Sequence, residues 1–292
     1  MEQQANSLAP RRILLATDLT SRSDRALDRA VLLAQAWQAQ LHVVHVVPDA
    51  ASGTPAGVDA EWYRQRYPTP RQEALRVIAR DLPVAEWNAV LHVEESNAPG
   101  AAILAVAERE GCGLIVMGES RRRLLDLQIE SLIEHVMRQA QASVLAVRDR
   151  PRGMYRNLLV GTDFTDEAQQ ALVVSAGLFA EAEVTLLHAS STPYSYLLDG
   201  APENALETAR LREHLAGANL PEARKASIRC VVQSGPPAAM LRRQVIEGAA
   251  DLTVIGAHPR GVLFDAAVGQ TRRIVDVVPG DVWMVRAVRP PA

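Results

Sequence analysis

Apolar runs of strand length alternate along the chain with longer amphipathic stretches. The runs show little polar alternation, which is typical of strands buried on both faces of a parallel sheet. In the first half of the chain these runs occupy residues 13–16, 41–47, 89–93, 114–117 and 144–147. The pattern therefore predicts five strands in this half.

The stretches between the runs have helical periodicity at residues 21–37, 100–110 and 131–140. The first of them places apolar side chains on one stripe, with Ser21 and Asp24 available to cap its start. Proline-containing stretches at 48–70 and 190–206 are less regular and predict loops with a partly helical continuation. The alternating order predicts an α/β fold, doubly wound around a five-stranded parallel sheet with right-handed crossovers.

The same pattern occurs twice. Residues 11–27 read RRILLATDLTSRSDRAL, and residues 156–172, which begin 145 positions later (156 − 11), read RNLLVGTDFTDEAQQAL. Further matches follow in the same order, pairing 40–47 with 183–190, 112–118 with 250–256 and 142–148 with 280–286. Repeats of this length are domains and not solenoid units.

The duplication predicts two tandem domains, at residues 1–149 and 154–292. The segment between them, DRPRG at 149–153, is charged and holds a proline and a glycine, as domain boundaries often do. The final strand of each copy, in 144–148 and 282–286, would expose unpaired amides at a sheet edge. We expect these two edges to pair with each other, which makes the chain an intramolecular pseudo-dimer.

Composition narrows the class of protein. With 48% hydrophobic and 22% charged residues, the chain has the composition of a soluble globular protein. It has no apolar run of about 18 residues and no leader pattern, so we expect a cytoplasmic protein without a membrane partner. The net charge of −3 gives no case for binding nucleic acid. Cys112 and Cys230 lie in different copies, with no second thiol beside either, and are expected to be reduced core thiols.

Motifs of several enzyme classes are missing from the sequence. A P-loop needs a lysine after its glycines, but the only lysine, Lys225, has no glycine near it. Neither G-x-S-x-G nor H-E-x-x-H occurs, and no trio of nucleophile, base and orienting acid can be assembled. Catalysis is therefore the weaker prediction.

Four residues are expected at one edge of their sheets. In an open parallel sheet the ligand crevice lies beyond the carboxyl ends of the strands, where the strand order reverses. Asp18 and Asp163 follow the first strands, and Gly118 and Gly256 follow the fourth strands. An aspartate there can accept hydrogen bonds from a ribose or an adenine, and a glycine loop can present amides to phosphates. Alternatively, each Asp-x-Thr caps the first helix, and the two roles are compatible.

Three histidines raise the question of a metal. His42, His45 and His92 all lie in the first copy, and imidazole is a common zinc ligand. However, His42 and His45 are three apart on a predicted strand and so point to opposite faces. This spacing favours packing over a metal site, and no metal is predicted.

The segments ILLATDLTSRSDRAL, LHVVHVV, LIVMGES and SVLAVR, at their spacing, resemble the universal stress protein family. The resemblance covers nearly the whole chain as two copies, as in tandem members of the family. It implies an adenine-nucleotide α-hydrolase-like fold, pairing of domains through their last strands and, in some members, ATP binding. The ATP-binding members carry G-x-x-G-x(9)-G-[ST] after the fourth strand.

The first copy departs from this family loop. From Gly118 it reads GESRRRLLDLQIESLIEHV, with Arg121 at the second glycine position and Ser131, or Glu130 with a shorter loop, at the third. Side chains at those positions add bulk where phosphate would approach the backbone, and Glu130 would repel it. The first copy is therefore expected not to bind ATP.

The second copy keeps more of the loop. From Gly256 it reads GAHPRGVLFDAAVGQTRRIV, with Pro259 at the second glycine position, which removes one amide donor. Gly269 stands at the third position, and Ala189 stands where the family offers backbone to adenine. The resemblance thus implies a nucleotide site formed by Thr162, Asp163, Ala189, Gly256, His258, Arg260, Gly269, Gln270 and Thr271.

Three hypotheses for the function follow. The first is a stress-response regulatory module whose second copy binds ATP or another adenine nucleotide, while the first copy is a structural or partner-binding half. The second is a nucleotide-independent interaction scaffold, and the third is a slow ATP hydrolase. Under each of them we expect the chain to form a homo-oligomer.

Overall fold

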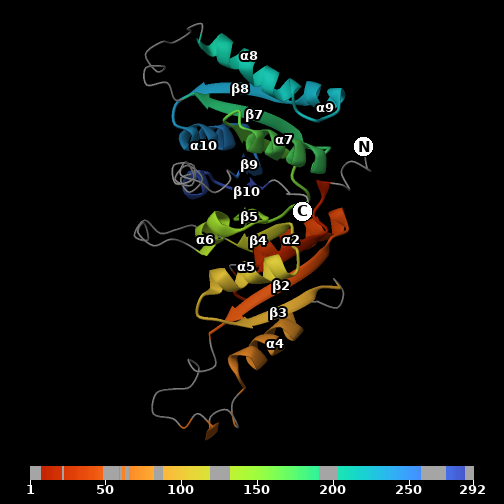
Figure 1. The fold of residues 1–292 in the computed structure, drawn as a ribbon, viewed down its shortest axis with the longest axis vertical. Coiled ribbons are helices and arrows are strands. Elements are labelled where there is room, and N and C mark those ends of the chain that lie inside the picture. Colours follow the sequence, from red (N-terminus) through yellow and green to blue (C-terminus); the bar gives the residue numbers. More distant parts are fainter. Residues whose placement is uncertain are drawn as a thin grey trace. The chain divides into compact units, whose positions relative to one another are not determined.

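The computed structural model describes residues 8–21, 23–48, 59, 61–62, 66, 68–81, 88–118, 132–190, 203–257 and 274–286. The chain divides into two compact units. The N-unit is Pro10–Ala142, and the C-unit combines Met1–Ala9 with Ser143–Ala292. Each unit contains parallel β-strands packed against helices (Figure 1).

Within its described residues, the N-unit contains four strands in the order β3-β2-β1-β4, all parallel to their neighbours. The strands are β1 (Arg12–Ala16), β2 (Gln40–Val47), β3 (Val90–Glu95) and β4 (Leu114–Gly118). The helices are α2 (Asp24–Trp37), α4 (Pro70–Asp81), α5 (Pro99–Arg109) and α6 (Leu132–Gln139). Helix α2 packs on β1 and β4, α4 on β3, and α5 on β2 and α6.

The part of the C-unit that the structure describes contains six strands in the order β5-β10-β9-β6-β7-β8. They are β5 (Ser143–Val147), β6 (Asn157–Thr162), β7 (Glu183–Ser190), β8 (Arg229–Ser234), β9 (Leu252–Gly256) and β10 (Asp281–Val285). The helices are α7 (Asp166–Leu178), α8 (Glu203–Ala216), α9 (Glu222–Ser227) and α10 (Pro237–Gly248). Helix α7 packs on β9, β6 and β10, α10 on β7, and α8 on β8.

The strands form the core, as their apolar runs predict. Ile13, Leu14 and Leu15 of β1 are completely buried, and every residue of β5 and β10 is buried. Side chains on both faces of such strands are covered by helices, so both must be apolar. The result is the doubly wound α/β arrangement that the sequence predicts.

The final strands of the two copies pair with each other. Strand β5 runs antiparallel to β10, with Ala146 opposite Val282 and Leu145 opposite Trp283. This confirms the predicted pairing of the two edges. Because of it, β5 belongs to the C-unit by packing although it ends the first copy in sequence. The ranges 1–149 and 154–292 stay a prediction about the sequence repeat.

The start of the first helix differs from the prediction. Helix α2 begins at Asp24, and Ser23, not Ser21, is its N-cap residue, without a side-chain capping bond. The Ser23 hydroxyl instead donates to Asp18 Oδ1 at 2.7 Å. Its oxygen accepts from the Asp18 backbone N–H at 3.3 Å, so the hydroxyl bonds back to the preceding turn on both sides and does not cap the helix. Within the described residues, no helix has the length and apolar character needed to cross a membrane.

Candidate functional site

The turn after β6 places Asp163 at the carboxyl edge of the C-unit sheet. Asp163 Oδ1 accepts from the Thr165 backbone N–H at 3.2 Å and from the Thr165 hydroxyl at 2.5 Å. Thr165 Oγ1 in turn accepts from Ala168 N–H at 3.3 Å and caps helix α7. The Asp-x-Thr sequence therefore organises the helix start, which is the capping role predicted for it.

Gly256, at the end of β9, lies directly against the start of α7. A Cβ atom built on it would come within 2.6–2.7 Å of backbone atoms of Glu167 and Ala168. Real Cβ atoms do not approach backbone so closely, so this position requires glycine. The close approach brings the first turn of α7, which carries Asp166 and Glu167, to the end of β9.

Polar side chains gather beside this edge from β6, β7 and α8. His188 Nδ1 donates to the Thr162 carbonyl oxygen at 2.9 Å, and its Nε2 lies 3.6 Å from Glu207 Oε2. Thr162 Oγ1 and His214 Nε2 form a hydrogen bond of 3.1 Å. Burial lowers the pKa of His214, and the nearby Asp163 carboxylate only partly opposes this effect. The imidazole of His214 is therefore held largely neutral.

Phe164 lies at the centre of this group. Its backbone is left-handed, with a φ of 67°. The guanidinium of Arg210 lies 4.2 Å from the centre of its ring, within the range of a cation–π contact. The rings of His188 and His214 are 4.1 and 5.6 Å away. The edge of the C-unit thus combines an aromatic ring with ionisable side chains from α8.

In the N-unit an apolar cluster takes the place of the group around Phe164. Leu19 replaces Phe164 with the same left-handed backbone, at a φ of 57°. It packs on a cluster formed by Val47, Ala74, Ile78 and Val93. His45 repeats the contact of His188, with Nδ1 2.9 Å from the Thr17 carbonyl oxygen. The two copies therefore share a scaffold but differ in what covers the carboxyl edge.

The Asp18 carboxylate of the N-unit is occupied by its own turn. Asp18 Oδ1 accepts from the Thr20 N–H at 2.9 Å, the Thr20 hydroxyl at 2.8 Å and the Ser23 hydroxyl at 2.7 Å. Burial acts to raise the pKa of Asp18, but these hydrogen bonds outweigh it and lower the pKa overall. The carboxylate is thus ionised and committed to local structure.

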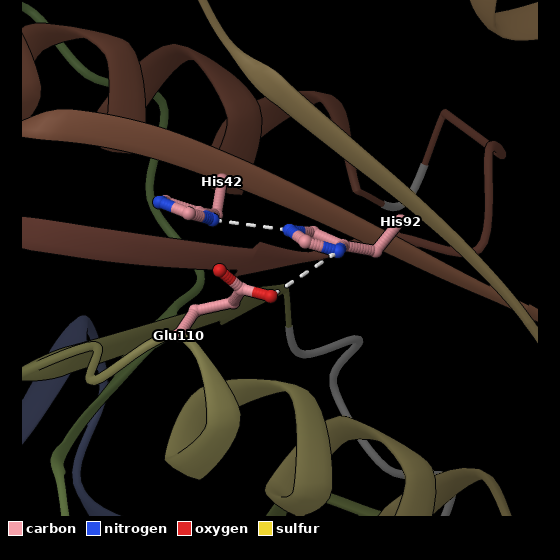
Figure 2. Close-up of side chains that lie close together, drawn as sticks. All are labelled: His42, His92 and Glu110. Carbon is pink, nitrogen blue, oxygen red and sulfur yellow. Dashed lines mark hydrogen bonds and ion pairs between the residues drawn. The ribbon is translucent and has the colours of Figure 1, made fainter.

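A second group of ionisable side chains lies elsewhere in the N-unit. His42 of β2 and His92 of β3 face each other, with His42 Nδ1 3.0 Å from His92 Nε2 and the two rings inclined by only 7° (Figure 2). Glu110, which directly follows α5, lies under the pair, with Oε1 4.0 Å from His92 Nδ1. Burial lowers the pKa of both histidines, which favours their neutral forms.

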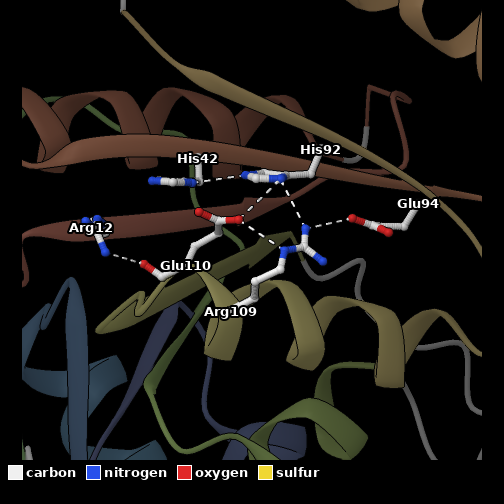
Figure 3. A network of polar contacts seen from close by, with 6 residues as sticks. All are labelled: Arg12, His42, His92, Glu94, Arg109 and Glu110. Carbon is white, nitrogen blue, oxygen red and sulfur yellow. Dashed lines mark hydrogen bonds and ion pairs between the residues drawn. The ribbon is translucent and has the colours of Figure 1, made fainter. Parts of the chain in front are cut away.

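Two arginines border this group (Figure 3). Arg109 donates to Glu94 at 2.9 Å and to Glu110 at 3.1 Å, and its Nη2 lies 3.4 Å from His92 Nδ1. Arg12 donates to the backbone carbonyl of Glu110 at 2.7 Å and so fixes the end of α5. Both hydrogen bonds of Arg109 to carboxylates raise its pKa, so it stays charged.

Comparison with models of known protein families shows which family the chain belongs to. The model of the universal stress protein family matches residues 10–148 and again residues 154–286. The chain belongs to the universal stress protein family. It contains two copies of the family domain, as the sequence predicts.

Solved structures of universal stress proteins have the same fold. One from Archaeoglobus fulgidus is similar with a TM-score of 0.67 at 15% identity, over 94% of this chain and 98% of that one. A putative universal stress protein from Pseudomonas aeruginosa is similar with a TM-score of 0.63 at 21% identity, over 96% and 94% of the two chains. No match was found among the curated proteins.

The structure describes four of the predicted nucleotide-site residues of this universal stress protein. Thr162, Asp163 and Gly256 lie at the carboxyl ends of β6 and β9, and Ala189 lies near the end of β7, opposite Gln233 of β8. The other five predicted positions lie outside the described residues: His258, Arg260, Gly269, Gln270 and Thr271. The loop residues Arg121, Glu130 and Ser131 of the first copy lie outside them as well.

Several residues of these groups were not found by sequence reasoning. Glu207, Arg210 and His214 come from α8, where their spacing of three and four residues places them on one helical face. From this spacing, the sequence could have predicted that the three side chains share one face of a helix. Glu110 gave no such signal, because only the packing of α5 beside β2 brings it to His42 and His92.

Proposed function

We propose that this universal stress protein is a stress-response regulatory module whose second copy binds an adenine nucleotide. In this proposal the nucleotide lies at the carboxyl edge of β6 and β9, and the first copy is a structural or partner-binding half. The observation that carries the proposal is the contrast between the two edges. In the N-unit Leu19 packs on an apolar cluster, whereas in the C-unit Phe164, at the matching position, lies among ionisable side chains.

The close contact between Gly256 and α7 also supports the proposal. A glycine that leaves no room for a Cβ brings the N-terminal turn of α7 to the strand end, and helix N-termini favour anionic groups such as phosphate. Asp163, next to this turn, provides carboxylate oxygens of the kind that accept hydrogen bonds from ribose or adenine. The first copy has the matching aspartate, Asp18, but its carboxylate oxygen also accepts from the Ser23 hydroxyl.

The test measures thermal unfolding of the full chain with ATP, ADP and AMP. A ligand that binds only the folded state stabilises it by about 2.7 kcal/mol at a hundredfold excess over Kd. We expect saturable stabilisation that is lost in Asp163→Ala and kept in the matched Asp18→Ala. In the loops, Gly269→Arg should abolish it and Ser131→Arg should not.

The other outcomes decide between the alternatives. No stabilisation and no heat of binding with any of the three nucleotides would reject the proposal in favour of a nucleotide-independent scaffold. Equal loss from the paired substitutions would reject the assignment to the second copy. ATP hydrolysis that disappears with Asp163→Ala would indicate an enzyme instead of a regulatory binding module.

A further inference from the structure

His42, His92 and Glu110 form a cluster that the fold alone does not require. The second copy builds the same strand pair without it, since Thr185 stands at the position that matches His42. There the Thr185 hydroxyl accepts from Arg229 Nη2 at 2.9 Å. The second copy thus forms the same pair of strands without a histidine at this position.

His42 has one ring nitrogen that faces the cluster and one that points away from it. His42 is only 4% exposed, and its Nε2 atom is buried without a hydrogen-bond partner. A neutral imidazole has one N–H, so whichever way the His42–His92 bond runs, a lone pair or an N–H of His42 stays unpaired. Nε2 lies on the side of the ring away from His92, so when Nε2 carries the proton, Nδ1 presents its lone pair to the cluster.

The donor set is that of a transition-metal site. One ligand atom from each of the three residues lies within 4.8 Å of the others. In a tetrahedral zinc site with Zn–N bonds of about 2.0–2.1 Å, two nitrogens are about 3.3 Å apart. The facing nitrogens of His42 and His92 are 3.0 Å apart, so an ion needs a few tenths of an ångström more and a rotation of both rings that turns their lone pairs from each other toward the ion.

The surrounding charges allow a cation to enter. The Glu110 carboxylate offsets part of the charge of the ion, and Arg12 holds the backbone of Glu110 in place. Arg109 is the competing cation, but its side chain is 50% exposed and it keeps a second partner, Glu94, at 2.9 Å. It can therefore give up Glu110 without losing all of its contacts or being moved from a buried position (Figure 3).

We propose that His42, His92 and Glu110 bind one divalent transition-metal ion, zinc by preference. Two imidazoles and one carboxylate leave at least one coordination position for water, as in three-ligand zinc sites. His42 and His92 stand near the amino ends of β2 and β3, whereas the proposed nucleotide site is at the carboxyl ends of strands in the other copy. The two sites are therefore independent.

The test titrates zinc into the full chain after treatment with a chelator, followed by calorimetry and thermal unfolding. We expect one ion per chain and a rise in unfolding temperature. His92→Gln and Glu110→Gln should each weaken binding about tenfold or more. His45→Gln is the matched control, because it removes an imidazole from the same strand on the opposite face, and it should bind zinc as the unaltered chain does.

Two further measurements keep the proposal falsifiable if a core substitution disturbs folding. Cobalt(II) should give the visible absorption of a low-coordinate site in the unaltered chain, and His92→Gln should lack it. Arg109→Gln removes a half-exposed competing cation, so it should bind zinc several-fold more tightly. No zinc binding by the unaltered chain, unchanged affinity in His92→Gln, or weaker binding in Arg109→Gln would each overturn the proposal.

Discussion

Gly256 combines a structural requirement with a place in the candidate site. Its Cα lies so close to the start of α7 that an added Cβ would meet backbone atoms at 2.6–2.7 Å. Backbone cannot move aside as the end of a flexible side chain can. The first turn of α7 must therefore shift when any side chain is introduced, with or without a ligand.

We expect Gly256→Ala to lower the free energy of unfolding by about 1–3 kcal/mol, the usual cost of overpacking. Denaturant unfolding of the full chain measures this. Gly161→Ala is the control, because a Cβ there would meet Leu241 and Ile255 side chains only at the ordinary distances of 3.5–3.7 Å. Equal stability of Gly256→Ala and the unaltered chain would contradict the contact seen in the structure.

His214 makes stability depend on pH in a direction that its environment sets. Burial lowers its pKa below the ordinary value of 6.5, so the unfolded chain takes up the proton first as the pH falls. The neutral ring contributes fully to the free energy of unfolding above about pH 6.5, and this contribution is lost as the pH falls toward the lowered pKa. His214→Gln should therefore lose less unfolding free energy than the unaltered chain between about pH 7.5 and pH 5.5. Parallel pH profiles of the two proteins would show that burial does not shift this histidine.

Helix α7 depends on its first residues more than α2 does. Thr165 caps α7 by accepting from the Ala168 N–H, whereas the Ser23 oxygen accepts from the Asp18 N–H and makes no capping bond to α2. Thr165→Ala should cost about 0.5–2 kcal/mol of unfolding free energy, the range for a lost N-cap. Chemical denaturation tests this, and Thr165→Ser, which keeps the hydroxyl, should retain most of the stability. An equal loss in both variants would assign the effect to the methyl group instead of the cap.

The strands were predictable from sequence because both of their faces are buried. Residues 144–147, for example, are apolar throughout and form most of β5. Helix α8 was not placed, because its face toward Phe164 carries Glu207, Arg210 and His214 instead of apolar residues. Apolar periodicity detects only helices whose buried face is apolar.

The candidate site was predictable in part for a related reason. Asp163 and Gly256 follow strands directly, so strand prediction alone puts them at the carboxyl edge. The cluster around His42 was set aside, because strand geometry separates His42 from His45 but does not indicate which other side chains His42 meets. Its partners His92 and Glu110 come from a neighbouring strand and a helix end, whose proximity depends on the packing of the whole unit.

The junction between the two copies depends on one buried carboxylate. Asp281, at the start of β10, is 1% exposed. Its Oδ1 accepts from the backbone N–H groups of Arg148 and Asp149 at 2.8 and 3.0 Å, and its Oδ2 accepts from the Tyr155 hydroxyl at 2.5 Å. A residue of the last strand of the second copy thus holds the chain that leaves the last strand of the first.

Replacing this carboxylate should weaken the whole C-unit, because β5, β10 and the connection at 148–155 all rely on it. Asp281→Asn puts an amide in place of an oxygen that accepts buried hydrogen bonds, and bonds to charged groups contribute about 1.5–3 kcal/mol each. We expect a loss of at least about 2 kcal/mol in denaturant unfolding.

Asp251→Asn is the matched control, since Asp251 also accepts two backbone N–H groups, from Arg156 and Asn157, but is only partly buried. Asp251→Asn should lose clearly less unfolding free energy, because water can replace the hydrogen bonds of this partly exposed carboxylate. Equal losses would mean that burial does not strengthen the Asp281 contacts, and that the pairing of β5 with β10 rests on its apolar side chains and backbone hydrogen bonds.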